Sequence, residues 1–181
     1  MKTTTWSIDP MHSEVQFKVK HLVITTVTGR FNDFSGNIRA DENFENVDID
    51  VEISTVSIST SNEQRDTHLK SADFFDVETY PKLSFRSDSL RRKRDGQYEL
   101  TGDITIKGIT RPIALSVEYA GIVTDPWGNI KAGFEVRGSL NRKLFGLNWN
   151  ATTETGGLVV SEDVKLAINL QLVKQVEPVA A

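Results

Sequence analysis

The chain has 181 residues, of which 38% are hydrophobic and 25% are charged, the size and composition of one ordinary globular domain. Asp and Glu number 25 against 21 Lys and Arg, and this net charge of −4 argues against a nucleic-acid binder. The absence of cysteine excludes disulfides, a thiol nucleophile and cysteine-ligated metals.

The start of the chain shows no export signal. No stretch of roughly 7–15 apolar residues follows Lys2, as a secretory signal peptide would require. Further along, no window approaches the roughly 20 consecutive apolar residues of a membrane helix. We therefore expect a soluble, cytoplasmic protein that is not integral to a membrane.

Apolar and polar residues alternate with a period of two through most of the chain, which is typical of strands with one buried face. Val15, Phe17 and Val19, for example, alternate with Gln16 and Lys18. The pattern predicts about nine strands. They are expected near 5–9, 13–21, 28–40, 47–58, 82–92 and 97–107, in two further segments up to about 141, and at 163–174.

Short turns separate the later strands. Asp95-Gly96 is typical of a tight hairpin, and Lys107-Gly108 and Asp125-Pro126-Trp127-Gly128 supply the next two turns. Residues 82 to about 141 are therefore predicted to form an antiparallel meander. An all-β sheet of this size must close into a barrel or split into a sandwich.

One segment departs from the strand pattern. Residues 61–70 favour a short helix, with Ser61 as the N-cap and Gln64 completing a capping box. A further helical turn is expected at Ser71–Asp76, which carries Phe74 and Phe75. We predict a helical cap over one end of the barrel. The whole chain, 1–181, is expected to be one domain with its core at 5–174, and residues 175–181 are expected to be frayed.

The motifs in this order resemble the YceI-like family of lipocalin-like proteins. They are Trp6-x-Ile8-Asp9-x-x-His12-Ser13, Gly29-x-Phe31, Arg65-Asp66-x-His68-Leu69, Asp73-Phe74-Phe75-Asp76, Pro81-x-x-x-Phe85-x-Ser87 and Gly102-x-Ile104-Thr105-Ile106-Lys107-Gly108-Ile109-Thr110. The resemblance runs from about Thr5 to Lys174. It implies an extended antiparallel barrel whose apolar pocket binds a polyisoprenoid, a fatty acid or a fatty acid amide. It also implies a possible homodimer. Many family members carry a signal peptide, and here this chain departs from the pattern.

The inward faces of the strands are the candidate binding surface. Small inward residues, including Gly102, Ala132 and Gly138, leave room for an alkyl chain, which gains about 0.8 kcal/mol per buried CH₂. The alternative is a solid core, which the pattern alone favours; the resemblance reverses this preference. The predicted ligand-binding residues are Phe17, Val19, His21, Phe31, Leu69, Phe74, Phe85, Ile104, Ile106, Phe134 and Val136.

Polar residues near the strand ends and on the helix are candidates for contact with a ligand headgroup. His21 continues the inward parity, and either bonds a headgroup or is a core histidine satisfied by a carbonyl. Arg65 and His68 share a helix face, and form either a headgroup contact or a network that ties the helix to the barrel. Arg142 could reach an anionic headgroup, although ordinary loop charge explains it as well.

Motifs for catalysis are missing. The chain has no Gly-x-Ser-x-Gly, no phosphate-binding Gly-x-x-x-x-Gly-Lys and no His-Glu-x-x-His. We therefore expect a ligand carrier rather than an enzyme, with no cofactor and no metal. Two alternatives stay open: a metal-dependent enzyme that uses His12, His21 and His68, and an interaction module that binds no ligand.

Overall fold

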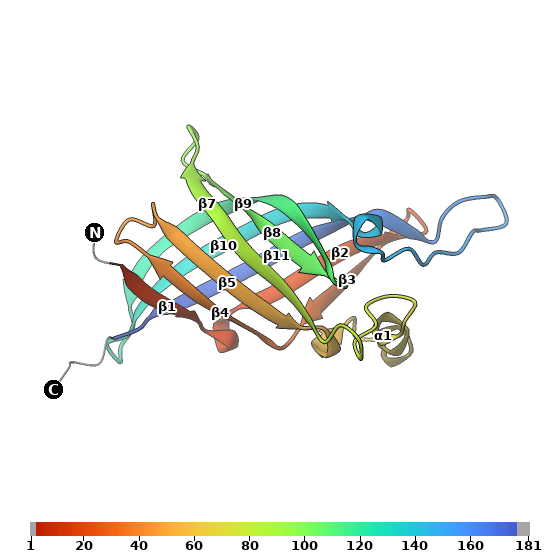
Figure 1. Cartoon of the computed structure of the whole chain (residues 1–181), viewed down its shortest axis with the longest axis horizontal. Coiled ribbons are helices and arrows are strands. Elements are labelled where there is room, and N and C mark those ends of the chain that lie inside the picture. The colour runs from red at the N-terminus through yellow and green to blue at the C-terminus, as the bar shows by residue number, and fades with distance from the viewer. Residues whose placement is uncertain (1–2, 177–181) are drawn as a thin grey trace.

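The computed structural model describes residues 3–176 and forms an elongated β-barrel with one short helix at one end (Figure 1). The expected all-β fold is thereby confirmed. The strands are β1 (Thr4–Ile8), β2 (Glu14–His21), β3 (Thr25–Phe31), β4 (Phe34–Ala40), β5 (Val47–Ser54), β6 (Ile58–Ser59), β7 (Lys82–Arg92), β8 (Tyr98–Ile106), β9 (Ile109–Thr124), β10 (Ile130–Asn141) and β11 (Val160–Lys174). The helix is α1 (Glu63–Lys70), and three single 3₁₀ turns lie at Pro10–His12, Thr55–Ser57 and Arg142–Phe145. The expected frayed tail falls mostly on 177–181, outside the described residues.

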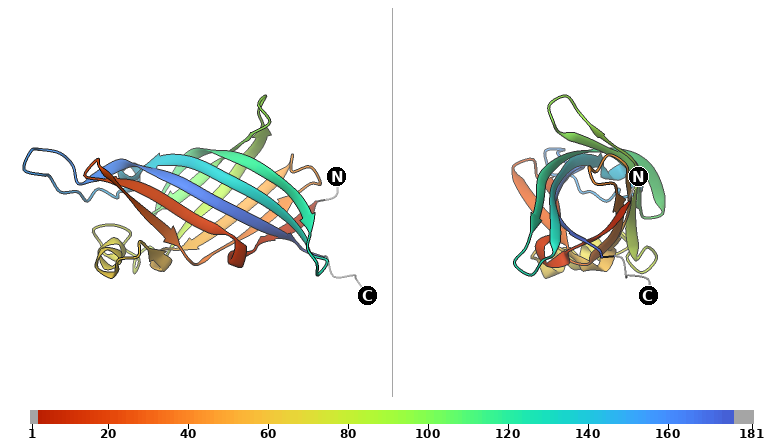
Figure 2. Two further views of the ribbon diagram at one scale, coloured as in Figure 1. Left: turned by 180° about the vertical axis from the view of Figure 1, so that it is seen from behind. Right: turned by 90° about the vertical axis from the view of Figure 1, so that its left-hand side faces the viewer.

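The barrel wall has eight positions, all joined by antiparallel pairing. The order is β1-β4-β5-β7-β8-β9-β10-β11, and β11 closes the ring by pairing with β1. Three of the positions are each occupied by two strands end to end. β2 continues β1, β3 continues β4, and β6 continues β5 along the barrel. The expected single strand at 28–40, for example, is bent at Asn32-Asp33 into β3 and β4. Figure 2 shows the resulting ring in its end-on view.

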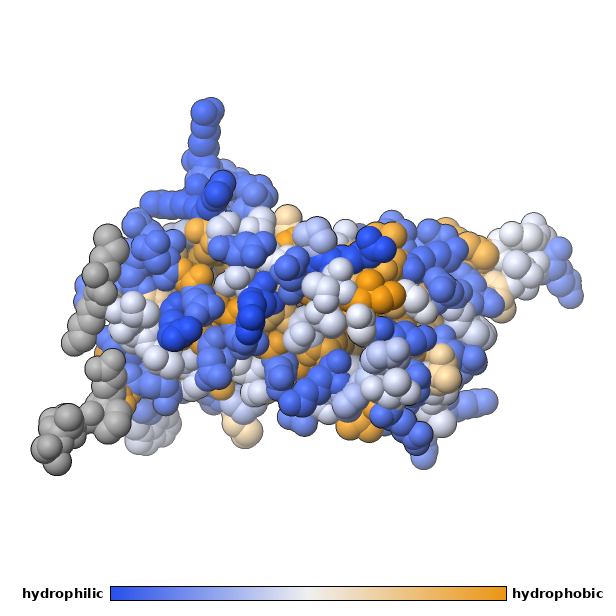
Figure 3. Space-filling model, viewed as in Figure 1, coloured by the Kyte–Doolittle hydropathy of each residue, from blue (hydrophilic) through white to orange (hydrophobic). Residues whose placement is uncertain are grey.

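The period-two pattern has its expected meaning in the barrel. Apolar side chains of alternate residues form the buried core, and polar side chains cover the outside. In Figure 3 the outer face is largely hydrophilic, with hydrophobic patches between the charged side chains.

The wall is incomplete at the α1 end. β3 pairs with β6 through only two residues, Arg30 and Phe31, and after Ser59 the chain leaves the sheet until β7 begins. Residues 60–81, which include α1, lie at this end beside β3 and β7 (Figure 1). The helical segment therefore lies where strand pairing stops.

The predicted start of the helix was wrong by one residue. The N-cap is Asn62, whose side-chain oxygen accepts from the Arg65 backbone N–H at 2.9 Å, whereas Ser61 has a left-handed φ of 59°. Gln64 consequently does not complete a capping box. The segment 71–76 forms hydrogen-bonded turns rather than a helical turn.

Candidate ligand-binding site

A cavity of about 540 Å³ occupies the half of the barrel next to α1. This is within the size range of small-molecule sites, roughly 300–1,000 Å³. Its walls come from β2, β3, β5, β7, β8, β10 and β11, from α1 and the turns that follow it, and from the loop between β10 and β11. Most lining side chains are apolar, so the cavity suits the apolar part of a ligand.

Eight of the eleven predicted ligand-binding residues line this cavity. They are Phe17, Val19, His21, Phe31, Leu69, Phe74, Ile104 and Ile106. The other three, Phe85, Phe134 and Val136, point inward as expected but lie in the other half of the barrel. Parity along a strand predicts which face is buried, but it carries no information about the position along the barrel axis.

The half of the barrel away from α1 is packed solid. Leu100, Leu115, Val117 and Val136 form a buried cluster there. The glycines that were expected to leave space do not do so: a Cβ at Gly138 would overlap the Leu115 side chain, and one at Gly102 would overlap Arg86 O and the Phe85 ring. Large neighbours have filled the room that these glycines leave.

Phe44 closes this solid end. It lies on the β4–β5 loop, is 4% exposed, and its ring centroid is 5.3 Å from that of Trp6 and 5.2 Å from that of Phe134. Asp41 holds the loop by accepting from the backbone N–H groups of Glu45 and Asn46. The cavity is therefore closed at the Phe44 end and is reached from the α1 end.

α1 is tied to the barrel through Thr60. The Arg65 guanidinium donates from Nε to Thr60 Oγ1 at 2.7 Å and from Nη2 to Thr60 O at 2.9 Å. Asp66 accepts from the Thr60 backbone N–H at 2.8 Å and from its hydroxyl at 2.6 Å. These contacts match the network that ties the helix to the barrel rim, one of the two roles considered for Arg65. Because Leu69 is the only apolar residue of α1, polar contacts contribute much of this attachment.

Arg142 lines the cavity, but its donors are occupied by backbone carbonyls. Nε donates to Ser161 O at 2.8 Å, and Nη1 donates to Leu147 O at 2.6 Å and to Trp149 O at 2.8 Å. The residue is 3% exposed, and burial lowers the pKa of its guanidinium, while Glu162 opposes the shift. Arg142 therefore holds the β10–β11 loop against β11, a role that neither the headgroup contact nor ordinary loop charge describes.

The two cavity histidines have different surroundings. His68 Nε2 lies 2.8 Å from Asp73 Oδ2, and its ring packs edge-on against Trp149 and Phe74 at 4.7 and 5.1 Å. His21 lines the cavity at the end of β2, and its ring has no hydrogen-bond partner among the described residues. His21 is therefore placed to bond to a ligand, whereas His68 is already held in place.

Sequence reasoning missed several lining residues. Trp149 could not be predicted as a lining residue, because it lies in an irregular loop without periodic pattern. Its ring lines the cavity and packs against His68 and Phe74. Leu166 and Ile168 were detectable, since they continue the inward parity of β11.

The three histidines are not gathered into a metal site. His12 lies beside Asp9 at 2.9 Å, away from the cavity, and within residues 3–176 no three His, Asp or Glu side chains are grouped to hold a metal ion. In the same part of the chain, no helix is long and apolar enough to cross a membrane.

The YceI-like domain model matches residues 6–172, almost the whole barrel. The chain belongs to the YceI-like family. A UPF0312 protein of Pectobacterium atrosepticum is 38% identical over 165 residues, which cover 91% of this chain and 82% of the relative. One from Staphylococcus aureus is 37% identical over 164 residues, covering 90% of this chain and 93% of the relative.

Solved structures agree with this YceI-like assignment. A Campylobacter jejuni YceI protein is 32% identical, with a TM-score of 0.74 over 88% of this chain and 91% of the other. Burkholderia cenocepacia BcnA shares the fold at 21% identity, with a TM-score of 0.79 over 91% and 98% of the two chains. A polyisoprenoid-binding domain from Saccharophagus degradans shares it at 14% identity, with a TM-score of 0.66 over 95% and 99%.

Proposed function

We propose that this protein binds a long-chain apolar or amphiphilic molecule, such as a polyisoprenoid, a fatty acid or a fatty acid amide, with its chain in the cavity. The observation that carries the proposal is an apolar cavity of about 540 Å³, closed on one side by the packed half of the barrel and reached from the α1 end. The S. degradans domain of the same fold, a polyisoprenoid-binding domain, supports this ligand class.

The driving force is burial of the alkyl chain. Each CH₂ removed from water contributes about 0.8 kcal/mol, so ten such groups contribute roughly 8 kcal/mol. Association costs about 4 kcal/mol or more, which is why a short chain would bind weakly and a long chain tightly. A carrier needs no chemistry beyond this burial, and we propose no catalytic step.

Polar residues that line the cavity are placed to receive a headgroup. They include Lys20, His21, Asn62, Gln64 and Arg65, and none of the described lining residues is Asp or Glu. This composition favours a ligand whose headgroup is anionic or offers hydrogen-bond acceptors. In the proposal, His21 donates to that headgroup, with further contacts from the Arg65 Nη1 that Thr60 does not take and from the His68 ring nitrogen that does not face Asp73.

Native mass spectrometry of the purified protein, followed by mass analysis of its organic extract, tests the proposal. We expect a bound species of a few hundred daltons that is released as a long-chain lipid. A protein that stays without ligand after incubation with polyprenols and fatty acids would refute it.

A matched pair of variants sharpens this experiment. Val19→Phe places a larger side chain in the cavity and should weaken ligand binding. The surrounding close-packed side chains cannot move aside without strain, so the added ring takes up ligand space. Lys18→Gln changes the exposed neighbour on the same strand, which does not line the cavity, and should leave binding unchanged.

Storage or transport of the ligand, a homodimer and a cytoplasmic location remain predictions. Light scattering after gel filtration tests the homodimer, and fractionation of the producing cells tests the location.

A further inference from the structure

The turn between β2 and β3 exposes apolar side chains to solvent. Val23 and Ile24 are each 79% exposed and Leu22 is 39% exposed. Tight hairpin turns usually carry Gly, Asn or Asp, both because these residues are polar or small and because they tolerate a positive φ. Leu22, Val23 and Ile24 are apolar and branched, so they neither favour solvent nor tolerate a positive φ.

The backbone of the turn is also unfavourable for its residues. Leu22 has a φ of 52° and Val23 a φ of 63°, both in the left-handed region. A β-branched residue there is a genuine outlier, because its Cβ crowds the following carbonyl. The turn therefore exposes an apolar tip, residues 22–24, in a backbone conformation that Asn or Gly would adopt at a lower cost in free energy.

The tip stands at the entrance of the cavity. His21 and Lys20, which immediately precede it, line the cavity, and the Leu22 backbone N–H donates to Val159 O at 2.9 Å. Val159 lines the cavity as well, and its neighbour Leu158 is 42% exposed. The β2–β3 turn, the β10–β11 loop and α1 all lie at the same end of the barrel (Figures 1 and 2).

We propose that this apolar tip, residues 22–24, inserts into the surface of a lipid bilayer and brings the cavity entrance against the membrane. The proposal rests on the proposed function, because a long-chain ligand is stored in membranes and must pass from one to the cavity. Apolar segments that enter the boundary between headgroups and acyl chains bind in proportion to the apolar area they bury, and attraction to anionic lipids adds to this binding.

The β2–β3 hairpin itself carries only cationic side chains, which favour an anionic bilayer, while on the adjacent β11 lie Glu162, which is paired with Lys143, and Asp163. Residues 18–31 contain Lys18, Lys20 and Arg30 and no Asp or Glu, and all three cations are exposed. Cations beside an inserted apolar segment attract anionic headgroups, each contributing within about a Debye length of the surface.

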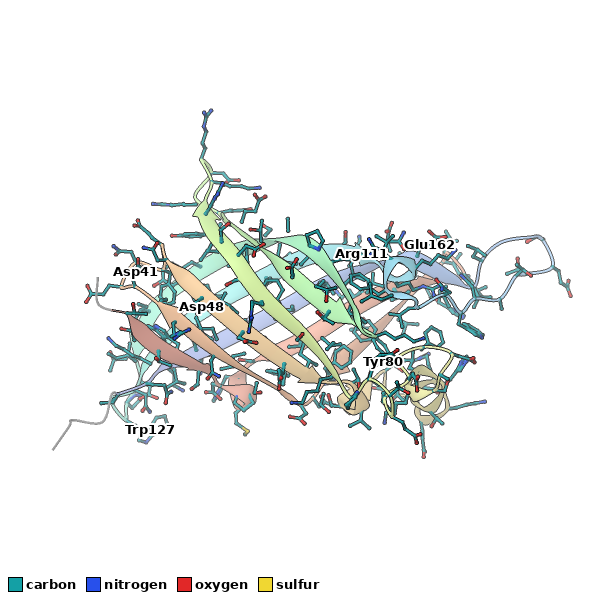
Figure 4. All side chains as sticks on the ribbon, viewed as in Figure 1. Asp41, Asp48, Tyr80, Arg111, Trp127 and Glu162 are labelled. Atoms are coloured by element: carbon teal, nitrogen blue, oxygen red, sulfur yellow. The ribbon has the colours of Figure 1, made fainter. Side chains whose placement is uncertain are left out.

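An apolar residue at the opposite end provides the natural comparison. Trp127, in the β9–β10 turn, is 83% exposed and lies far from Tyr80 and α1 (Figure 4). That end is closed by Phe44, so insertion of Trp127 would not connect a bilayer with the cavity. Exposure alone is similar at the two ends, and only the tip adjoins the entrance.

Flotation with vesicles of phosphatidylcholine and phosphatidylglycerol tests the proposal, using the full chain and the double variant Val23→Asn/Ile24→Ser. Asn tolerates the left-handed conformation, so this variant should fold at least as well as the natural chain. We expect its vesicle partition coefficient to fall by about ten-fold or more, and that of Trp127→Ser to change by less than about two-fold. Binding of a dansylated fatty acid in vesicle-free solution should be the same in all three proteins.

The proposal is overturned if the natural chain does not float, if the double variant floats equally well, or if Trp127→Ser is the variant that loses binding. It is also overturned if the double variant loses the fatty acid in solution, because the defect would then lie in the pocket. A dimer that the double variant abolishes while flotation is unchanged would assign the tip to a second copy instead. Flotation that depends on the tip, in a chain that never binds the fatty acid, would support docking and refute ligand carriage.

Discussion

The ring of Phe17 on β2 lies directly against Gly29, its cross-strand partner on β3. A Cβ added at Gly29 would lie under 3.0 Å from the Phe17 ring, so the ring occupies the space of the missing side chain. The ring also lines the cavity and contacts Phe31, with a centroid separation of 5.7 Å. Gly29 thus decides how far Phe17 extends into the cavity.

Replacing Gly29 with Ala should therefore narrow the cavity. The new methyl group displaces the Phe17 ring, and we expect ligand affinity to fall by about ten-fold, or about 1.4 kcal/mol. Titration with a fluorescent fatty acid measures this loss. Gly133→Ala is the control, because its Cβ would lie 3.3 Å from the Ala120 Cβ, outside the cavity. Equal affinities for Gly29→Ala and Gly133→Ala would contradict the prediction.

Phe44→Ala should destabilise the barrel at its closed end. Removing a buried ring costs about 3–5 kcal/mol, and the ring here contacts Trp6, Tyr119 and Phe134. Urea unfolding of the natural chain and the variant measures the loss in the free energy of unfolding. Trp127→Ala removes a larger but exposed side chain and should change stability by less than about 0.5 kcal/mol. A small loss for Phe44→Ala would mean that the end is not closed by packing.

Thr60→Val should loosen α1 without affecting the barrel. The substitution removes the hydroxyl that accepts from Arg65 and donates to Asp66, and hydrogen bonds to charged groups contribute about 1.5–3 kcal/mol. We expect faster amide exchange across α1 and faster ligand release. Thr67→Val removes a hydroxyl that bonds only Glu63 O on the exposed side of the same helix. If both variants behave alike, Thr60 does not tether the helix.

Arg142→Met should be among the most destabilising single changes. It leaves the carbonyls of Leu147, Trp149 and Ser161 without their buried donor, and each orphaned group costs about 1–3 kcal/mol. Lys143→Met removes only an exposed ion pair with Glu162, for which about 0–1 kcal/mol is expected. Urea unfolding of the two variants distinguishes these cases, and similar losses would show that the carbonyls are hydrated instead.

Acid should weaken the barrel through two aspartates that flank Lys131, each with a carboxylate oxygen 3.5 Å from Nζ. Burial raises the pKa of Asp9, but hydrogen bonds, chiefly from His12, outweigh it and lower the pKa. The Asn129 side chain lowers the pKa of Asp125. A carboxyl group whose pKa is lower in the folded chain than in the unfolded chain stabilises the fold. This stabilisation is complete at a pH well above the ordinary pKa of 3.8 and is lost as the pH falls through the pKa of the folded state.

Urea unfolding between about pH 3 and pH 6 measures this dependence, because the stability difference follows the protons bound on unfolding. Asp125→Asn should make the acid dependence shallower. Curves of the same slope for the natural chain and this variant would exclude Asp125 as a contributor.

Much of the architecture was predictable from local pattern. Alternation such as Val15-x-Phe17-x-Val19 requires a strand with one buried face, and Asp95-Gly96 requires a tight turn. The helix was predictable as well, but Ser61 and Asn62 are both good N-caps, and only the path of the chain leaving β6 decides between them.

The candidate site was predictable only in part. Phe17 and Phe85 both point inward, yet Phe17 lines the cavity and Phe85 fills the space beside Gly102. Arg142 reads as a loop cation, yet it is buried among carbonyls. Neither the different positions of Phe17 and Phe85 nor the burial of Arg142 can be predicted from local residue spacing, because each depends on partners far away in the chain.

Which residues face inward and where the chain turns can be predicted from local sequence, since both follow from backbone geometry over a few residues. Which half of the barrel is hollow depends on packing between strands and emerges only in the folded barrel. Whether an inward position is filled depends on how far side chains from neighbouring strands reach across it, as Leu115 does at Gly138. That is a property of cross-strand register and position along the axis, which no single strand encodes.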